Sequence, residues 1–172
     1  MTTNTNPDPI EARTKLWDLI KDIRFAMFTT RHDNGHLHSR PMTTQNSKLD
    51  EDSILWFFMS RKSEPVADLA ADATVNVVYA DPDADSYVSV SGTASVDEDA
   101  AKKQQLWSKM AEVWFPEGPS DPDLALVRVQ ITHANYWDVT DSKVVQLYKM
   151  AQAAMTGKPP TDLGEHAEVR MD

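Results

Sequence analysis

The sequence predicts a mainly β fold, a small antiparallel barrel of six strands with helices at its periphery. Three observations support this prediction. Six short segments are rich in β-branched and aromatic residues, which favour strands. Short turns separate several of them, and the helical patterns do not alternate with strands as they do in a doubly wound parallel sheet. Closing six such strands into a barrel removes the exposed sheet edges.

The chain begins with a polar stretch and a helix. Residues 1–8 are predicted to be a disordered N-terminal tail, because polar chain ends without a packing partner fray. Asp8 can accept a backbone hydrogen bond at a helix start, and Pro9 suits the first helical position. Leu16 and Ile20 then recur at the spacing of one helix face. A single domain is therefore expected over residues 9–157.

A hairpin turn and a long strand are the clearest β signals. Asn34 and Gly35 tolerate positive φ angles and predict the turn between the first two strands. In the long strand, alternation puts Tyr87 on one face and Val88 on the other, and Gly92 predicts a bulge. The six strands are expected at residues 25–30, 36–44, 54–59, 74–79, 86–96 and 125–132.

Helical spacing predicts three further helices. Ser63 can cap a short helix that runs to about residue 71. A second helix is expected over residues 98–114, with Trp107 and Trp114 on one stripe. A last helix is expected to end near Gly157, where glycine can adopt a left-handed conformation. Residues 158–172 are predicted to be a C-terminal tail.

Composition excludes several functions. The 172 residues hold 17 Lys and Arg against 27 Asp and Glu, a net charge of −10, which disfavours binding to nucleic acids and to anionic membranes. With no cysteine, disulfides, thiolate zinc sites, iron–sulfur clusters and cysteine nucleophiles are excluded. The N-terminus lacks the pattern of a signal peptide, and no apolar run is long enough to span a bilayer, so a cytoplasmic location is expected.

Three segments together could hold a flat aromatic phosphate. Ser60-Arg61-Lys62 stands at a predicted helix start, where cations and backbone N–H groups can bind an anion. Arg40 on the second strand could add a guanidinium, and the indole of Trp137 could cover a ring. Ordinary surface charges and core aromatic residues explain each segment equally well when it is taken alone. His36 and His38 share a strand face, but no third ligand at fixed spacing accompanies them, so no metal ion is expected.

These segments resemble the general stress protein branch of the pyridoxamine-5′-phosphate-oxidase-like flavin-binding split barrels. The resemblance is carried by FAMFTTRHDNGHLHSRPM, ILWFFMSRKSEPVADL, VSVSGTASV and ANYWDVTDSKVVQLYKMAQAAMTG, which together span about residues 21–157. It implies a six-stranded antiparallel split barrel, a homodimer, and FMN, in some members FAD, at the dimer interface.

The resemblance also implies roles for individual residues. The isoalloxazine ring and ribityl chain would lie along the second strand and the backbone at the end of the third. The turn after the third strand would surround the phosphate, and Trp137 would come from the partner subunit. Trp107 and Trp114 could face the site across the interface or lie in the core. The cofactor-binding residues implied are Arg40, Pro41, Met42, Thr43, Phe58, Met59, Ser60, Arg61, Lys62, Ser63, Tyr87 and Trp137.

One departure limits the activity that can be carried over. The true oxidases have an Arg-x-His element after the tryptophan that holds the substrate phosphate, whereas residues 138–145 here contain neither Arg nor His. Pyridoxamine phosphate oxidase activity is therefore not expected, and no residue is assigned a catalytic role. Three possibilities remain open: a flavin-dependent oxidoreductase of unknown substrate, a non-catalytic flavin storage or sensing module that acts through protein contacts, or a barrel that holds no cofactor or holds haem or a deazaflavin instead.

Overall fold

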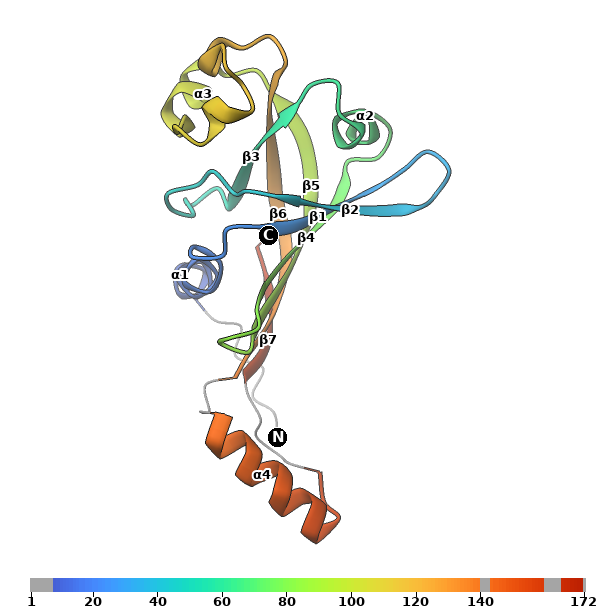
Figure 1. Cartoon of the computed structure of the whole chain (residues 1–172), viewed down its shortest axis with the longest axis vertical. Helices are drawn as coiled ribbons and strands as arrows, with labels where there is room; N and C mark the ends of the chain where they lie inside the picture. The colour runs from blue at the N-terminus through green and yellow to red at the C-terminus, as the bar shows by residue number, and fades with distance from the viewer. Residues whose placement is uncertain (1–7, 140–142, 160–164, 172) are drawn as a thin grey trace.

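A computed structural model of the chain describes residues 8–139, 143–159 and 165–171. One strongly curled antiparallel sheet forms its centre, with strand order β2-β1-β4-β5-β6-β3 and with β7 also paired to β6 (Figure 1). The strands are β1 (Ala26–Arg31), β2 (Leu37–Met42), β3 (Ile54–Ser60), β4 (Thr74–Asp81), β5 (Ser86–Asp97), β6 (Leu124–Asp138) and β7 (Glu165–Arg170). The helices are α1 (Pro9–Ile20), α2 (Glu64–Ala71), α3 (Ala100–Leu106) and α4 (Lys143–Thr156), with 3-10 turns η1 (Ala111–Val113) and η2 (Gly118–Ser120).

The sheet closes where its two outermost strands meet. The segment after β2 forms an isolated bridge between Thr44 and Phe57 of β3. The N–H of Gln45 donates to the carbonyl of Trp56 at 2.8 Å. The end of β2 therefore lies beside β3, although these strands are at opposite ends of the strand order. This closure gives the barrel that the strand pattern predicts.

The core lies inside the curl of the sheet. Phe28 of β1 and Phe57 of β3 meet edge to face with ring centroids 5.2 Å apart, and both side chains are fully buried. Helix α1 covers one opening of the sheet with Leu16 and Ile20. Asp8 caps this helix as predicted, since its side chain accepts from the N–H of Ile10 at 3.0 Å. Burial of these apolar side chains is the main stabilising contribution.

The long strand β5 confirms both predictions made for it. Val88 and Val90 are buried, whereas Tyr87 lies on the outer face. The register with β6 shifts at Gly92, which marks the predicted bulge. A Cβ atom added at Gly92 would lie only 2.2 Å from the carbonyl oxygen of Gln130, so the two backbones approach too closely for any other residue.

Two expected elements differ from the structure. The helix predicted over residues 98–114 ends at Leu106, because Trp107 has an extended backbone (ψ 136°) and turns its ring onto Phe58, at 5.8 Å between centroids. Trp114 is 78% exposed and does not continue a buried stripe. The range predicted as a C-terminal tail, residues 158–172, contains β7, which pairs with β6 from His133 to Asp138. The predicted N-terminal tail lies outside the described residues, except for Asp8.

Helix α4 projects from the far end of the sheet, between β6 and β7 in the chain (Figure 1). It ends where the sequence predicted, with Gly157 in the left-handed region at φ 67°. None of the described helices is long and apolar enough to cross a membrane.

Candidate functional site

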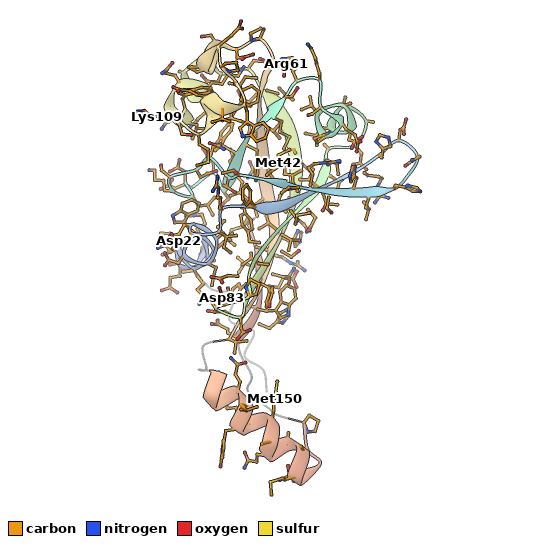
Figure 2. The ribbon with its side chains drawn as sticks, viewed as in Figure 1. Asp22, Met42, Arg61, Asp83, Lys109 and Met150 are labelled. Atoms are coloured by element: carbon orange, nitrogen blue, oxygen red, sulfur yellow. The ribbon has the colours of Figure 1, made fainter. Side chains whose placement is uncertain are left out.

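The structure brings two of the predicted segments together. Arg40–Thr43 runs along the end of β2, and Phe58–Ser63 runs from the end of β3 into α2. The bridge between Thr44 and Phe57 places these segments side by side. Figure 2 shows Met42 in the upper half of the molecule and Arg61 above it. This junction is the candidate site.

Two residues of the junction, Ser60 and Arg61, form side-chain hydrogen bonds with other parts of the chain. The Ser60 hydroxyl donates to Asp123 Oδ2 at 2.7 Å. The Arg61 guanidinium makes a two-pronged ion pair with Glu98, at 2.8 and 3.1 Å, and also donates to the carbonyl of Leu124 at 3.2 Å. These hydrogen bonds raise the pKa of Arg61 and lower the pKa of Glu98 from their ordinary values. Arg61 therefore points toward α3 and away from α2.

Lys62 and Ser63 belong to the same turn, and within the described part of the chain their side chains have no hydrogen-bond partner. Within the described part of the chain, the ammonium of the exposed Lys62 has no hydrogen-bond or ion-pair partner. Ser63 occupies the N-cap position of α2, as predicted, but its side chain makes no capping hydrogen bond. Its hydroxyl oxygen is buried without any partner, which normally costs about 1–3 kcal/mol. A free cation and an unpaired hydroxyl thus belong to adjacent residues at a helix N-terminus, which attracts anions.

Arg40 belongs to a charged cluster that joins the β1–β2 hairpin to α2. Its guanidinium donates to Thr30 Oγ1 at 2.7 Å and to Glu64 Oε1 at 2.9 Å, and lies 3.9 Å from Asp68 Oδ2. The buried Asp68 also accepts from the Thr30 hydroxyl at 2.6 Å and from His32 Nδ1 at 2.8 Å. Because its partners lie on three elements, this cluster fixes the first turn of α2 relative to the β sheet.

The pKa values in the cluster shift as its geometry requires. Burial tends to raise the pKa of Asp68, but hydrogen bonds from Thr30 and His32 and the nearby charges hold it below its ordinary value. The hydrogen bond from His38 lowers the pKa of Glu64, and the hydrogen bond to Asp68 raises that of His32. The cluster therefore favours ionised carboxylates and a protonated His32.

Three of the clustered groups also have the spacing of metal ligands. One ligand atom from each of His32, Glu64 and Asp68 lies within 4.8 Å of the other two. The Arg40 guanidinium already supplies positive charge to both carboxylates at this place. The arrangement is a complete ion-pair network, and we assign it a structural role.

The remaining residues of the junction line it in different ways. Pro41 is exposed on the outer face of the edge strand, whereas Met42 packs against the core. Thr43 is half-buried, and its carbonyl accepts from the Gln45 side chain at 3.0 Å. Phe58 is half-buried beneath Trp107. Met59 is fully buried, so its side chain does not line the junction.

Tyr87 and Trp137 lie elsewhere in the chain. They are register partners on β5 and β6 and are 40% and 44% exposed. Ser60 pairs with Leu124 at the opposite end of β6. With a rise of about 3.3 Å per residue, the 13 steps from Leu124 to Trp137 span roughly 40 Å along the strand. Within one chain, these two aromatic residues therefore do not meet the Ser60–Ser63 end of the junction.

The sequence analysis did not predict the carboxylates that form ion pairs with Arg40 and Arg61. Glu98 holds Arg61, and Glu64 with Asp68 holds Arg40. Glu64 and Asp68 stand at i and i+4, a spacing that puts both on one helix face and that could have signalled a shared partner. The partner itself is 24 residues away from Glu64, and no local pattern reveals that pairing.

Comparison with known proteins identifies the family. Residues 11–161 match the family described as pyridoxamine 5′-phosphate oxidase like. The chain belongs to this family. It is 31% identical to protein bli-3 of Neurospora crassa over 150 residues, which cover 80% of this chain and 70% of that protein. It is 26% identical to general stress protein 26 of Bacillus subtilis over 123 residues, 70% of this chain and 84% of that one.

The fold agrees with the same assignment. The crystal structure of the general stress FMN/FAD binding protein of Xanthomonas citri superposes with a TM-score of 0.65 at 31% identity, covering 77% of this chain and 92% of that one. The mainly β split barrel and the general stress protein branch expected from the sequence are therefore confirmed. The segment in which the true oxidases carry their substrate-binding Arg and His falls partly on residues 140–142, outside the described part of the chain.

Proposed function

We propose that this protein binds a flavin nucleotide, with the flavin phosphate at the turn between β3 and α2. The observation that carries the proposal is the unpaired, buried Ser63 hydroxyl beside the unpaired Lys62 ammonium. Both would gain a partner from a phosphate, and charge-assisted hydrogen bonds of this kind contribute about 1.5–3 kcal/mol each. The FMN/FAD binding protein named above supports the choice of ligand.

The junction also suits the rest of the FMN unit. The ribityl chain and ring would run from the phosphate along Arg40–Thr43 and the backbone of Phe58 and Met59. Arg40 would reach the ring only by sharing its guanidinium with Glu64, which holds it at 2.9 Å. When bound, a flavin supplies hydride or electron transfer, while these residues hold the ring and set its surroundings.

A homodimer would complete this site. A part of the outer face of the sheet, which we call the outer sheet face, presents a patch of uncharged side chains across five strands. Its residues are Met27 and Thr29 of β1, Ser39 and Pro41 of β2, Asn76 and Val78 of β4, Tyr87 and Ser89 of β5, and Asn135 and Trp137 of β6. In a chain with 26% charged residues, such a face favours contact with another protein surface.

The same dimer would explain where Tyr87 and Trp137 act. Both lie on the outer sheet face and far from the phosphate end of their own junction, so we propose that they approach the flavin of the partner subunit. Because they are register neighbours, they would contact it together.

The activity we propose is that of an oxidoreductase that uses this flavin. Bleaching of the flavin absorbance by NADH or NADPH would support turnover. The absence of bleaching with a range of reductants would favour a storage or sensing role.

Titration with FMN and riboflavin tests the phosphate site. We expect Lys62→Met to weaken FMN binding by about ten- to a hundred-fold and Ser63→Ala to weaken it by about five- to ten-fold, because each substitution removes a hydrogen-bond partner of the phosphate. Riboflavin lacks the phosphate and should bind all variants alike. Lys48→Met is the matched control, since Lys48 is an exposed lysine that pairs with Asp50. Equal losses for the two ligands would remove the phosphate from this turn.

A further inference from the structure

Helix α4 carries apolar side chains that the described part of its own chain leaves uncovered. Leu147, Tyr148 and Met150 are each more than half exposed, and Met155 is 88% exposed. No side chain of the helix is buried over residues 146–156. A helix of 14 residues is only marginally stable in water, and most helices in proteins are held by the packing of an apolar face. Helix α4 therefore needs a surface to pack against.

The charge of α4 is opposite to that of the whole protein. Residues 143–158 contain three lysines and no aspartate or glutamate, whereas the net charge of the chain is −10. Complementary interfaces pair a positive surface with a negative one. A surface that fits α4 is therefore apolar at its centre and acidic at its rim.

The segment around η1 has this character. Val113 and Trp114 are 76% and 78% exposed, and Met110 is half exposed beside them in the chain. We call these three residues the η1 patch. Arg24 borders the patch, since its guanidinium donates to the sulfur of Met110 at 3.3 Å and lies over the ring of Phe25 at 5.0 Å. Apolar surface of this kind favours contact with another protein surface.

Acidic residues surround the η1 patch in the chain. Residues 109–123 contain four acids and a single base, Lys109. Asp121 and Asp123 accept hydrogen bonds near the start of β6. Glu112 and Glu117 are exposed, and their carboxylates form no ion pair among the described residues. These two acids leave negative charge available for a positive partner.

The η1 patch and α4 lie at opposite ends of one molecule. The chain passes from one to the other through β6, whose 14 steps from Leu124 to Asp138 span roughly 45 Å along the strand. Figure 1 shows α3, which precedes η1, at the upper end and α4 at the lower end. In Figure 2, Lys109 and Met150 are separated in the same way. A second copy that points in the reverse direction would bring its α4 to the η1 patch of the first.

We infer that α4 of each subunit packs on the η1 patch of its partner. A twofold axis relates the two subunits, so the contact is made twice and the assembly closes as a dimer. The positive helix then meets the acidic rim, and the apolar side chains of both surfaces leave water. The inference rests on the homodimer of the proposed function and names the contact that holds it together.

The same arrangement agrees with the place proposed for Trp137. Only residues 138–142 separate Trp137 from α4. Trp107, three residues before Met110, packs on Phe58 of the junction. A subunit that brings Trp137 to the junction of its partner therefore also carries α4 toward the partner's η1 patch.

Cysteine cross-linking tests the contact directly, because the protein has no cysteine of its own. A variant with both Val113→Cys and Leu147→Cys, treated with a short bismaleimide, should give a covalent dimer on a denaturing gel. Neither single variant should do so, since equal positions lie at opposite ends of the dimer. A variant with Asp33→Cys and Leu147→Cys is the control, because Asp33 is exposed at the tip of the β1–β2 hairpin and should not reach α4 of the partner.

Sedimentation equilibrium of the full chain measures the same contact without a reagent. Leu147→Glu should weaken dimerisation by about tenfold or more, because it places a carboxylate against the acidic rim. Ile10→Glu is the matched control, since Ile10 is 65% exposed, close to the 70% of Leu147, and lies on α1. It should leave the dimerisation constant unchanged.

The possible outcomes separate this inference from the proposed function. An unchanged dimerisation constant in Leu147→Glu, or the lack of a covalent dimer in the Val113→Cys, Leu147→Cys variant, would overturn the α4 contact alone. Cross-linking into longer polymers would overturn the closed arrangement. Failure of the unaltered protein to dimerise would overturn the contact together with the proposed dimer, whereas the FMN and riboflavin titrations test the phosphate site independently.

Discussion

Replacing Asp68 with alanine removes the buried centre of the cluster that joins the β1–β2 hairpin to α2. The Asp68 side chain is only 4% exposed and accepts hydrogen bonds from Thr30 at 2.6 Å and His32 at 2.8 Å. Hydrogen bonds to a charged group contribute about 1.5–3 kcal/mol each, and removing one partner of a buried ion pair costs about 3–5 kcal/mol. We therefore expect Asp68→Ala to lower the free energy of unfolding by about 3–5 kcal/mol.

Urea unfolding at one fixed protein concentration measures this loss, because the stability of the proposed dimer would depend on concentration. Asp50→Ala is the matched control: Asp50 is exposed and pairs only with Lys48, so its loss should cost less than about 1 kcal/mol. The reasoning about the cluster would be refuted if Asp68→Ala were no more destabilising than Asp50→Ala.

Three further predictions follow from the structure. Gly92→Ala should destabilise the protein by about 1–3 kcal/mol or more in urea unfolding, because the added Cβ meets the carbonyl of Gln130 at 2.2 Å; an unchanged midpoint would contradict the tight bulge. Trp137→Ala should weaken both dimerisation and flavin binding without unfolding the monomer, as sedimentation equilibrium with and without FMN can show; a monomer with undiminished FMN affinity would contradict the shared site. Because the hydrogen bond to Asp68 raises the pKa of His32, the stability that His32 contributes is fully present below its ordinary value of 6.5 and is lost as the pH rises through the raised value. Unfolding should therefore become easier as the pH rises above 6.5, and a His32→Asn variant should lack that component.

Strands and turns could be read from the sequence because their signals are local. The alternation in β5, the Asn34-Gly35 turn and the bulge at Gly92 each depend on neighbouring residues only, and each is confirmed. The predicted end of this helix, at residue 114, was wrong because a contact between residues distant in sequence decides where α3 ends. Trp107 packs on Phe58 of β3, and this contact takes its backbone out of the helix.

Strand β7 shows a second limit of pattern reading. Its sequence, EHAEVR, has a single buried apolar side chain, Val169, and four residues that can carry charge sit on exposed positions. Such a segment has no strand signal of its own. It becomes a strand because the long β6 offers a free edge with unpaired backbone groups, which β7 satisfies.

The candidate site was predictable in part because some of its signals are also local in sequence. The run Ser60–Ser63 is compact in sequence, and its position at a strand end and helix start is as expected. The pairing of Arg61 with Glu98 and of Arg40 with Glu64 depends on the folded backbone, which brings together residues 37 and 24 positions apart. These pairs leave Lys62 and Ser63 as the members of the turn that are open to a ligand.

The structure of the protein crystallised with a flavin nucleotide would test the central proposal most directly. We predict that the phosphate next to the ribityl chain lies within hydrogen-bond distance of the Lys62 ammonium and the Ser63 hydroxyl, with the ring extending toward Arg40–Thr43. A flavin whose phosphate lies away from the turn between β3 and α2, or crystals that take up no flavin at saturating concentration, would contradict it.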